Sequence, residues 1–146
     1  MKSYRFQVPI NRPPSEVFPF VVEPEKQALY SDVPMRLLTE GSIRTGSKME
    51  VVLGSGFMKA TLGLEMVDVD QDRKMAFRTY SGPLDWQGEY LIEPAENGGS
   101  TLTHQGSMTF HGLWRLVEPL VGGELTRGGA QEMDRLKNAV ESSAKT

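Results

Sequence analysis

The chain opens on a two-residue hydrophobic period. Over residues 3–10 every second side chain is large and apolar, which predicts a β-strand with one buried face. Residues 13–16, Pro-Pro-Ser-Glu, follow it, and proline in a first turn with an acid behind it is typical of a helix start. Pro19 lies inside the apolar run of this helix and should kink it or keep it short. A second short helix is expected to follow and to reach about Tyr30.

Residues 34–110 predict a meander of antiparallel strands, because apolar-rich runs alternate there with turns rich in Gly, Asp and Asn. The Asn97-Gly98 pair favours a tight hairpin, since both residue types tolerate positive φ. Gly63, Gly88 and Gly106 lie inside strands and predict bulges or sharp bends of one curved sheet. The predicted strands are 48–53, 58–69, 74–80, 86–93 and 101–110.

The last third of the chain changes to a helical period. Its apolar residues recur at spacings of three and four, which predicts one long amphipathic helix at the C-terminus. A preliminary turn should end at Pro119, before the main helix. The pairs 122–123 and 128–129 are Gly-Gly and interrupt the pattern, and each Gly inside a helix costs about 1 kcal/mol relative to Ala. The periodic residues are Leu113, Leu116, Val117, Leu120, Val121, Met133, Leu136 and Val140.

The order of these elements predicts an α+β domain over residues 1–146. A chain of this length normally makes one domain. A curved antiparallel sheet cannot bury its concave face alone, so the only long helix must lie against that face. Such a grip leaves a cavity between helix and sheet unless large side chains fill it.

Stretches along nearly the whole chain resemble the SRPBCC superfamily, which includes START-like, Bet v 1-like and polyketide cyclase/dehydrase-like proteins. Residues 8–18 resemble the family's first strand and helix start, and residues 40–47 (EGSIRTGS) its Glu-Gly to Gly-Ser turn. Residues 98–103 (GGSTLT) resemble a hairpin exit, and Leu136-Lys137 the closing Leu-Lys of the last helix. The strand stretches 73–78 and 88–94 are also similar to the family's.

The resemblance implies a helix-grip fold: a curved antiparallel sheet around a long C-terminal helix, with two short helices after the first strand. It implies much less about activity, because the family includes lipid and sterol carriers, aromatic polyketide cyclases and hormone receptors. The glycine pairs of the last helix depart from the smooth helix usual in the family, which points to a gate or to a close approach of the ligand.

Composition excludes several classes of function. The chain has no Cys, which excludes disulfides, thiol nucleophiles, iron–sulfur clusters and thiolate zinc sites. Its 16 basic and 19 acidic residues give a net charge of −3 without a basic cluster, which argues against nucleic-acid binding. No apolar run reaches the roughly 18 residues of a membrane span, and no signal peptide precedes the domain, so we expect a cytoplasmic protein.

Two His residues are too few for a catalytic zinc, and we expect no metal and no cofactor. The expected partner is a hydrophobic small molecule, and a homodimer is left open as an assembly. Eight Met residues suit an adaptable cavity wall, since the thioether side chain is flexible and polarizable.

Trp86, Tyr90 and His104 are the candidates for chemistry, because their strand positions share the inward face of two neighbouring strands. A His beside a Tyr hydroxyl is able to supply general acid and base, so His104 and Tyr90 are the candidate catalytic pair. The alternative is that both are hydrogen-bonded polar members of an apolar wall. The predicted ligand-binding residues are Phe6, Met58, Leu62, Met75, Phe77, Thr79, Trp86, Tyr90, His104, Met108, Leu125 and Met133.

Three hypotheses follow. The first is a binding module for a hydrophobic or aromatic small molecule: a lipid, a sterol or a polyketide-like compound. The second is a polyketide cyclase or dehydratase with His104 and Tyr90 as acid and base and Trp86 stacked on the substrate ring. The third is a protein that stabilises a partner or a hydrophobic intermediate, for which the sequence offers no direct indication.

Overall fold

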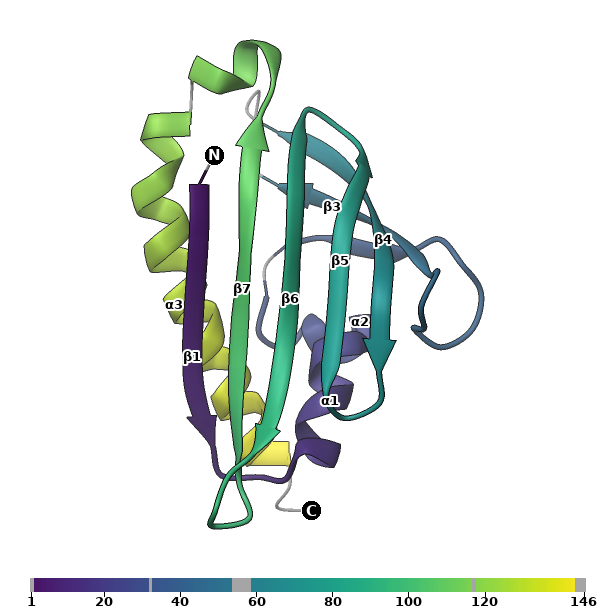
Figure 1. Ribbon diagram of the computed structural model, residues 1–146, viewed down its shortest axis with the longest axis vertical. Coiled ribbons are helices and arrows are strands. Elements are labelled where there is room, and N and C mark those ends of the chain that lie inside the picture. The colour runs from purple at the N-terminus through teal and green to yellow at the C-terminus, as the bar shows by residue number, and fades with distance from the viewer. Residues whose placement is uncertain (1, 32, 54–58, 117, 144–146) are drawn as a thin grey trace.

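The computed structural model describes residues 2–31, 33–53, 59–116 and 118–143, with the side chains of residues 118–127 outside the description. Seven antiparallel strands form one sheet in the order β1-β7-β6-β5-β4-β3-β2 (Figure 1). The strands are β1 (Lys2–Ile10), β2 (Met35–Leu37), β3 (Lys48–Leu53), β4 (Ala60–Asp70), β5 (Lys74–Ser81), β6 (Leu84–Pro94) and β7 (Ser100–Phe110). The helices are α1 (Pro14–Val22), α2 (Pro24–Gln27), the 3-10 helix η2 (Gly112–Leu116) and α3 (Glu118–Ser143).

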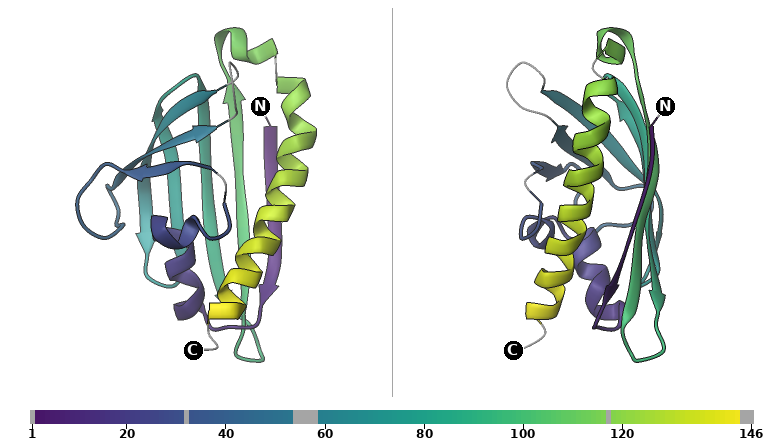
Figure 2. Two further views of the ribbon diagram at one scale, coloured as in Figure 1. Left: turned by 180° about the vertical axis from the view of Figure 1, so that it is seen from behind. Right: turned by 90° about the vertical axis from the view of Figure 1, so that its left-hand side faces the viewer.

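All three α-helices lie on one side of the sheet, in the hollow formed by its curvature (Figure 2). This is the predicted α+β helix-grip fold, which is confirmed. The predicted strands are confirmed with small changes at their ends, and the predicted strand 58–69 begins at Ala60. η2 is a preliminary turn before the long helix, but it ends at Leu116 and not at Pro119, which lies in the first turn of α3.

The prediction that glycine pairs interrupt the last helix is wrong. α3 runs as one helix of 26 residues through both pairs. Gly129 instead allows a close approach of α3 to β1: a Cβ atom added there would lie 2.4 Å from the ring of Phe6. What lies close to Gly129 is therefore a side chain of the sheet, where the resemblance had pointed to a ligand.

The core lies where α1 and the second half of α3 meet the concave face. Val17 and Val21 of α1 and Val140 of α3 are fully buried, and Leu136 is 1% exposed. They pack in one apolar cluster with side chains of β1, β4 and β7.

On α3, Met133, Leu136 and Val140 are buried as the sequence predicts. Leu113 and Leu116, predicted to continue the same buried face, lie instead in η2 and are 83% and 75% exposed, so that part of the prediction is wrong. Val117 and the side chains of Leu120 and Val121 lie outside the described residues.

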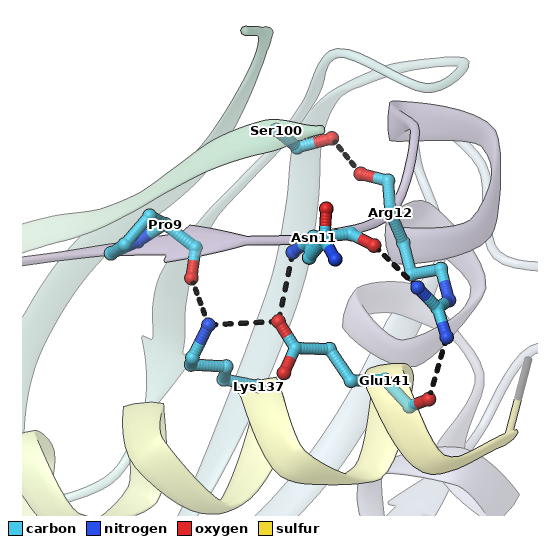
Figure 3. A network of polar contacts seen from close by, with 6 residues as sticks. All are labelled: Pro9, Asn11, Arg12, Ser100, Lys137 and Glu141. Atoms are coloured by element: carbon cyan, nitrogen blue, oxygen red, sulfur yellow. Dashed lines mark hydrogen bonds and ion pairs between the residues drawn. The ribbon is translucent and has the colours of Figure 1, made fainter. Parts of the chain in front are cut away.

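Polar contacts fasten the end of α3 to the loop that follows β1 (Figure 3). Lys137 Nζ donates to the backbone oxygen of Pro9 at 2.8 Å and pairs with the Glu141 carboxylate, also at 2.8 Å. The same carboxylate accepts the backbone N–H of Asn11 at 2.8 Å, and the Arg12 guanidinium donates to the backbone oxygen of Glu141. A polar cavity of about 280 Å³ lies beside these contacts, lined by Asn11, Arg12, Asn138, Glu141 and Ser142.

Glu141→Gln should weaken this attachment at neutral pH. The hydrogen bonds from Lys137 and from the backbone of Asn11 lower the pKa of Glu141, so the carboxylate is favoured in the folded state. Its contribution is present above the ordinary pKa and is lost as the pH falls through the lowered one. Because both side chains are partly exposed, at 31% and 27%, we expect a loss of only about 0.5–1 kcal/mol in urea unfolding at pH 7, and a smaller loss as the pH falls. Glu96→Gln, in the exposed β6–β7 hairpin, is the control, and an equal loss there would contradict the assignment.

Candidate functional site

The strand register brings aromatic side chains together on the concave face, over the four strands from the edge strand β1 to β5. Phe6 of β1 pairs with His104 of β7, and His104 pairs on its other side with Tyr90 of β6. Tyr90 in turn pairs with Met75 of β5. Four neighbouring strands therefore carry one continuous row of side chains across the sheet.

His104 is flanked by aromatic rings. It stacks on Tyr90 with ring centroids 4.0 Å apart and planes inclined by 14°. Tyr4 meets it edge-on at 4.9 Å, and Phe77 meets Trp86 in the same edge-on way at 4.9 Å. We call Tyr4, Phe6, Phe77, Trp86, Tyr90 and His104 the aromatic wall.

The Tyr4 hydroxyl joins two polar members of the aromatic wall. Trp86 Nε1 donates a hydrogen bond to Tyr4 Oη at 2.8 Å. Tyr4 Oη also lies 3.0 Å from His104 Nε2, within hydrogen-bond distance. Three strands, β1, β6 and β7, thus contribute one side chain each to a single polar chain inside an apolar surface.

Glycines make the space in which the Tyr4 hydroxyl lies. Gly88 and Gly106 pair with each other on β6 and β7, and a Cβ atom added at either would come within 2.8 Å of Tyr4 Oη. Their strands pair there in unbroken register, so neither position is a bulge, and the alternative of a sharp bend stays a prediction. The register does shift beside Gly63, where the prediction is confirmed.

The polar members of the wall are neutral at physiological pH. Burial lowers the pKa of His104 to about 3. Burial raises the pKa of Tyr4 to about 12, against the hydrogen bond from Trp86, and the negative charge of Glu132 raises it further. Burial, with a smaller contribution from Glu132, also raises the pKa values of Tyr30 and Tyr90 above their ordinary range.

The part of the aromatic wall on β1, β7 and β6 is less buried than the core beside it. Tyr4, Phe6, Trp86 and His104 are only half-buried. Residues of the same strands further toward α1 are almost completely covered: Val8, Ile10, Ile92 and Leu102 are at most 6% exposed. The aromatic wall therefore keeps surface that a ligand could cover.

Most of the predicted lining residues lie in or beside the aromatic wall. Phe6, Phe77, Trp86, Tyr90 and His104 belong to it. Met75 and Met108 pair across strands with Tyr90 and Trp86. Leu62 and Met133 are buried in the core cluster. The Thr79 hydroxyl accepts the backbone N–H of Trp86, so it supports the wall. Met58 and the side chain of Leu125 lie outside the described residues.

Three residues of this region were not among the predicted site residues: Tyr4, Tyr30 and Glu132. Tyr4 could have been found, because it alternates with Phe6 on the inward face of the first strand. Tyr30 follows α2, and its hydroxyl donates to the backbone oxygen of Phe20 at 2.8 Å. Glu132 precedes the buried Met133 on α3 and is close enough to three tyrosines to raise their pKa values. The sequence does not predict the position of Glu132, because that position depends on how α3 is rotated against the sheet.

Among the described residues no group of three or more His, Asp or Glu side chains is arranged to hold a metal ion. No helix in the described ranges is long and apolar enough to cross a membrane.

Comparisons place the chain among known proteins. The family model described as polyketide cyclase / dehydrase and lipid transport matches residues 1–141. The solved structure of TTHA0849 from Thermus thermophilus is similar, with a TM-score of 0.81 at 15% identity over 99% of this chain and 100% of that one. No curated protein matches.

Two further structures have the same fold. Ara h 8.0201 has a TM-score of 0.70 at 14% identity, covering 97% of this chain and 98% of that one. DynU16, from the dynemicin biosynthetic locus, has a TM-score of 0.71 at 20% identity over 98% of this chain, which spans 48% of DynU16. The resemblance to the SRPBCC superfamily is thereby confirmed.

Proposed function

The chain belongs to the polyketide cyclase / dehydrase and lipid transport family, and from this premise we propose that it binds a hydrophobic or aromatic small molecule against the aromatic wall. The observation that supports this most is the half-buried state of Tyr4, Phe6, Trp86 and His104 on the β1, β7 and β6 side of the sheet. An apolar, aromatic lining with a few fixed polar groups is the usual composition of a small-molecule site. The ligand would lie between the sheet and α3.

Binding fits the electrostatics of the wall better than acid–base catalysis does. With a pKa of about 3, His104 is almost entirely neutral imidazole at pH 7, so it is a poor general acid and a weak base. The Tyr90 hydroxyl, with its raised pKa, is a weak acid. A cyclase or dehydratase that uses His104 and Tyr90 stays the alternative, and it would require the bound substrate to bring both pKa values toward neutrality.

Trp86→Ala should weaken binding of the tricyclic hydrocarbon fluorene by roughly three- to tenfold, because the indole offers an aromatic contact worth about 0.5–1.5 kcal/mol. Isothermal titration calorimetry gives the affinity. The matched control is Tyr80→Ala, which removes an exposed ring that Lys48 covers on the outer face of β5. That variant should bind fluorene as the wild type does.

His104→Phe separates the two functions. A binding protein should keep its fluorene affinity within about twofold, because fluorene has no group for a hydrogen bond and the ring contact with Tyr90 is retained. Equal loss in Trp86→Ala and Tyr80→Ala would contradict the proposed site. Loss of turnover of a polyketide-like substrate in His104→Phe, with binding unchanged, would favour the enzyme.

A further inference from the structure

The hydrogen-bond chain in the aromatic wall determines which nitrogen of His104 carries the proton. The indole Nε1 of Trp86 only donates, so Tyr4 Oη is the acceptor in the 2.8 Å contact between them. The hydroxyl hydrogen of Tyr4 then needs an acceptor of its own. Within the described part of the chain, His104 Nε2 is the acceptor that it reaches, at 3.0 Å.

The opposite arrangement leaves a polar group unsatisfied. If His104 Nε2 carried the proton, Tyr4 Oη would accept from both Trp86 and His104, and its own O–H would point at no acceptor among the described residues. An unsatisfied hydroxyl in this partly buried, apolar surrounding is costly. The favoured direction is therefore Trp86 to Tyr4 to His104, with Nε2 as the bare, accepting nitrogen.

The proton of neutral His104 then lies on Nδ1. Neutral imidazole carries one N–H, and burial keeps the ring neutral, since it lowers the pKa to about 3. Nδ1 has no hydrogen-bond partner among the described residues, and the side chain is only half-buried. A single N–H donor thus remains in the middle of an apolar, aromatic surface.

We propose that His104 Nδ1–H donates a hydrogen bond to an acceptor oxygen of the ligand, and that Tyr4 is the positioning residue that holds His104 in this tautomer. This rests on the proposed function and narrows it: the ligand is an aromatic or otherwise apolar ring system that carries a carbonyl or similar acceptor oxygen. Stacking of His104 on Tyr90 sets the plane in which the N–H points. Because Trp86 donates to Tyr4 Oη, the Tyr4 hydroxyl hydrogen is directed toward His104, so Trp86 influences the tautomer of His104 through Tyr4.

The tautomer is tested on the ligand-free protein by long-range ¹H–¹⁵N NMR of the two histidines. We expect His104 to show a protonated, pyrrole-type Nδ1 and a pyridine-type Nε2 at pH 7. In Tyr4→Phe the fixed pattern should be lost, with both nitrogens moving toward the values of exchanging tautomers. A protonated Nε2 in the wild type would overturn the proposal without any ligand being needed.

The donor role is tested with 9-fluorenone and fluorene, which share the same rings and differ in a carbonyl against a methylene group. The affinity for 9-fluorenone relative to that for fluorene should fall by roughly three- to tenfold in His104→Phe, and by a smaller factor in Tyr4→Phe. Fluorene, measured on the same variants, corrects for any change in the ring contacts. An unchanged ratio in both variants, with both compounds bound, would overturn the donor role and leave the proposed function standing. Failure of both compounds to bind the wild type would overturn the two together.

Discussion

His104→Phe should reduce the loss of stability that the protein suffers between pH 7 and pH 5. The folded pKa of about 3 lies below the ordinary value of 6.5, so the unfolded chain binds a proton at His104 that the folded chain does not. Protonation therefore favours unfolding as the pH falls from about 6.5 toward 3, and the contribution is constant outside that window. At pH 5 it amounts to at most about 2 kcal/mol, at 1.36 kcal/mol per pKa unit, because solvent that reaches the half-buried ring reduces it.

Urea unfolding at pH 7, 6 and 5 measures this effect as the difference in slope between wild type and variant. The groups that face His104 are Tyr4 of β1 and Tyr90 of β6, and neither tyrosine titrates in this range; Glu132 of α3 faces the same tyrosines. His111→Asn is the matched control, because His111 lies exposed beside Asp85, and this variant should keep most of the acid sensitivity. Parallel slopes for wild type and His104→Phe would contradict the burial of an uncharged His104.

Gly129→Ala and Gly128→Ala should change stability in opposite directions. The added methyl group at 129 would lie 2.4 Å from the Phe6 ring, and overpacking of this kind costs about 1–3 kcal/mol. At 128 no atom of the described residues lies within 4 Å of the new atom, so the higher helix propensity of Ala should stabilise the protein by about 1 kcal/mol. Urea unfolding at pH 7 measures both.

The effect at position 129 should also reach the aromatic wall. Phe6 stacks on Tyr4 at 5.7 Å, so a displaced Phe6 ring pushes on the side chain that holds Trp86 and His104. We expect the Trp86 indole N–H resonance to shift in Gly129→Ala and to stay in place in Gly128→Ala. Equal stabilisation by both substitutions would show that α3 does not press on β1 as the structure has it.

The fold could be predicted from the sequence because its patterns are local. The two-residue period of the strands and the three-to-four period of the last helix each assign a buried face, and the order of elements leaves one helix to cover one sheet. The exact match of β3 to the predicted strand 48–53 rests on such a pattern between two turns. The role of the glycines was harder to predict, since Gly88 and Gly106 leave space for the Tyr4 side chain, which belongs to another strand.

The contacts of the aromatic wall could not be predicted, because they join residues far apart in the chain. Tyr4 lies 82 positions from Trp86 and 100 from His104, and only the strand register brings them together. The hydrophobic period of the sequence predicts which face of the sheet a residue occupies, whereas its neighbours on that face depend on how the strands pair. The nucleic-acid exclusion, the cytoplasmic location, the homodimer and the roles of the site residues stay predictions.

The most direct test of ligand binding at the aromatic wall is methyl NMR of protein labelled at its Met side chains, titrated with 9-fluorenone. Met75 and Met108 pair with Tyr90 and Trp86, whereas Met35 lies on β2 at the far edge of the sheet, with β5, β4 and β3 between it and β6. The account predicts saturable shifts of the Met75 and Met108 methyl signals, with Met35 unmoved. Shifts confined to Met35, or no shift of the Met75 and Met108 signals at any concentration, would contradict it.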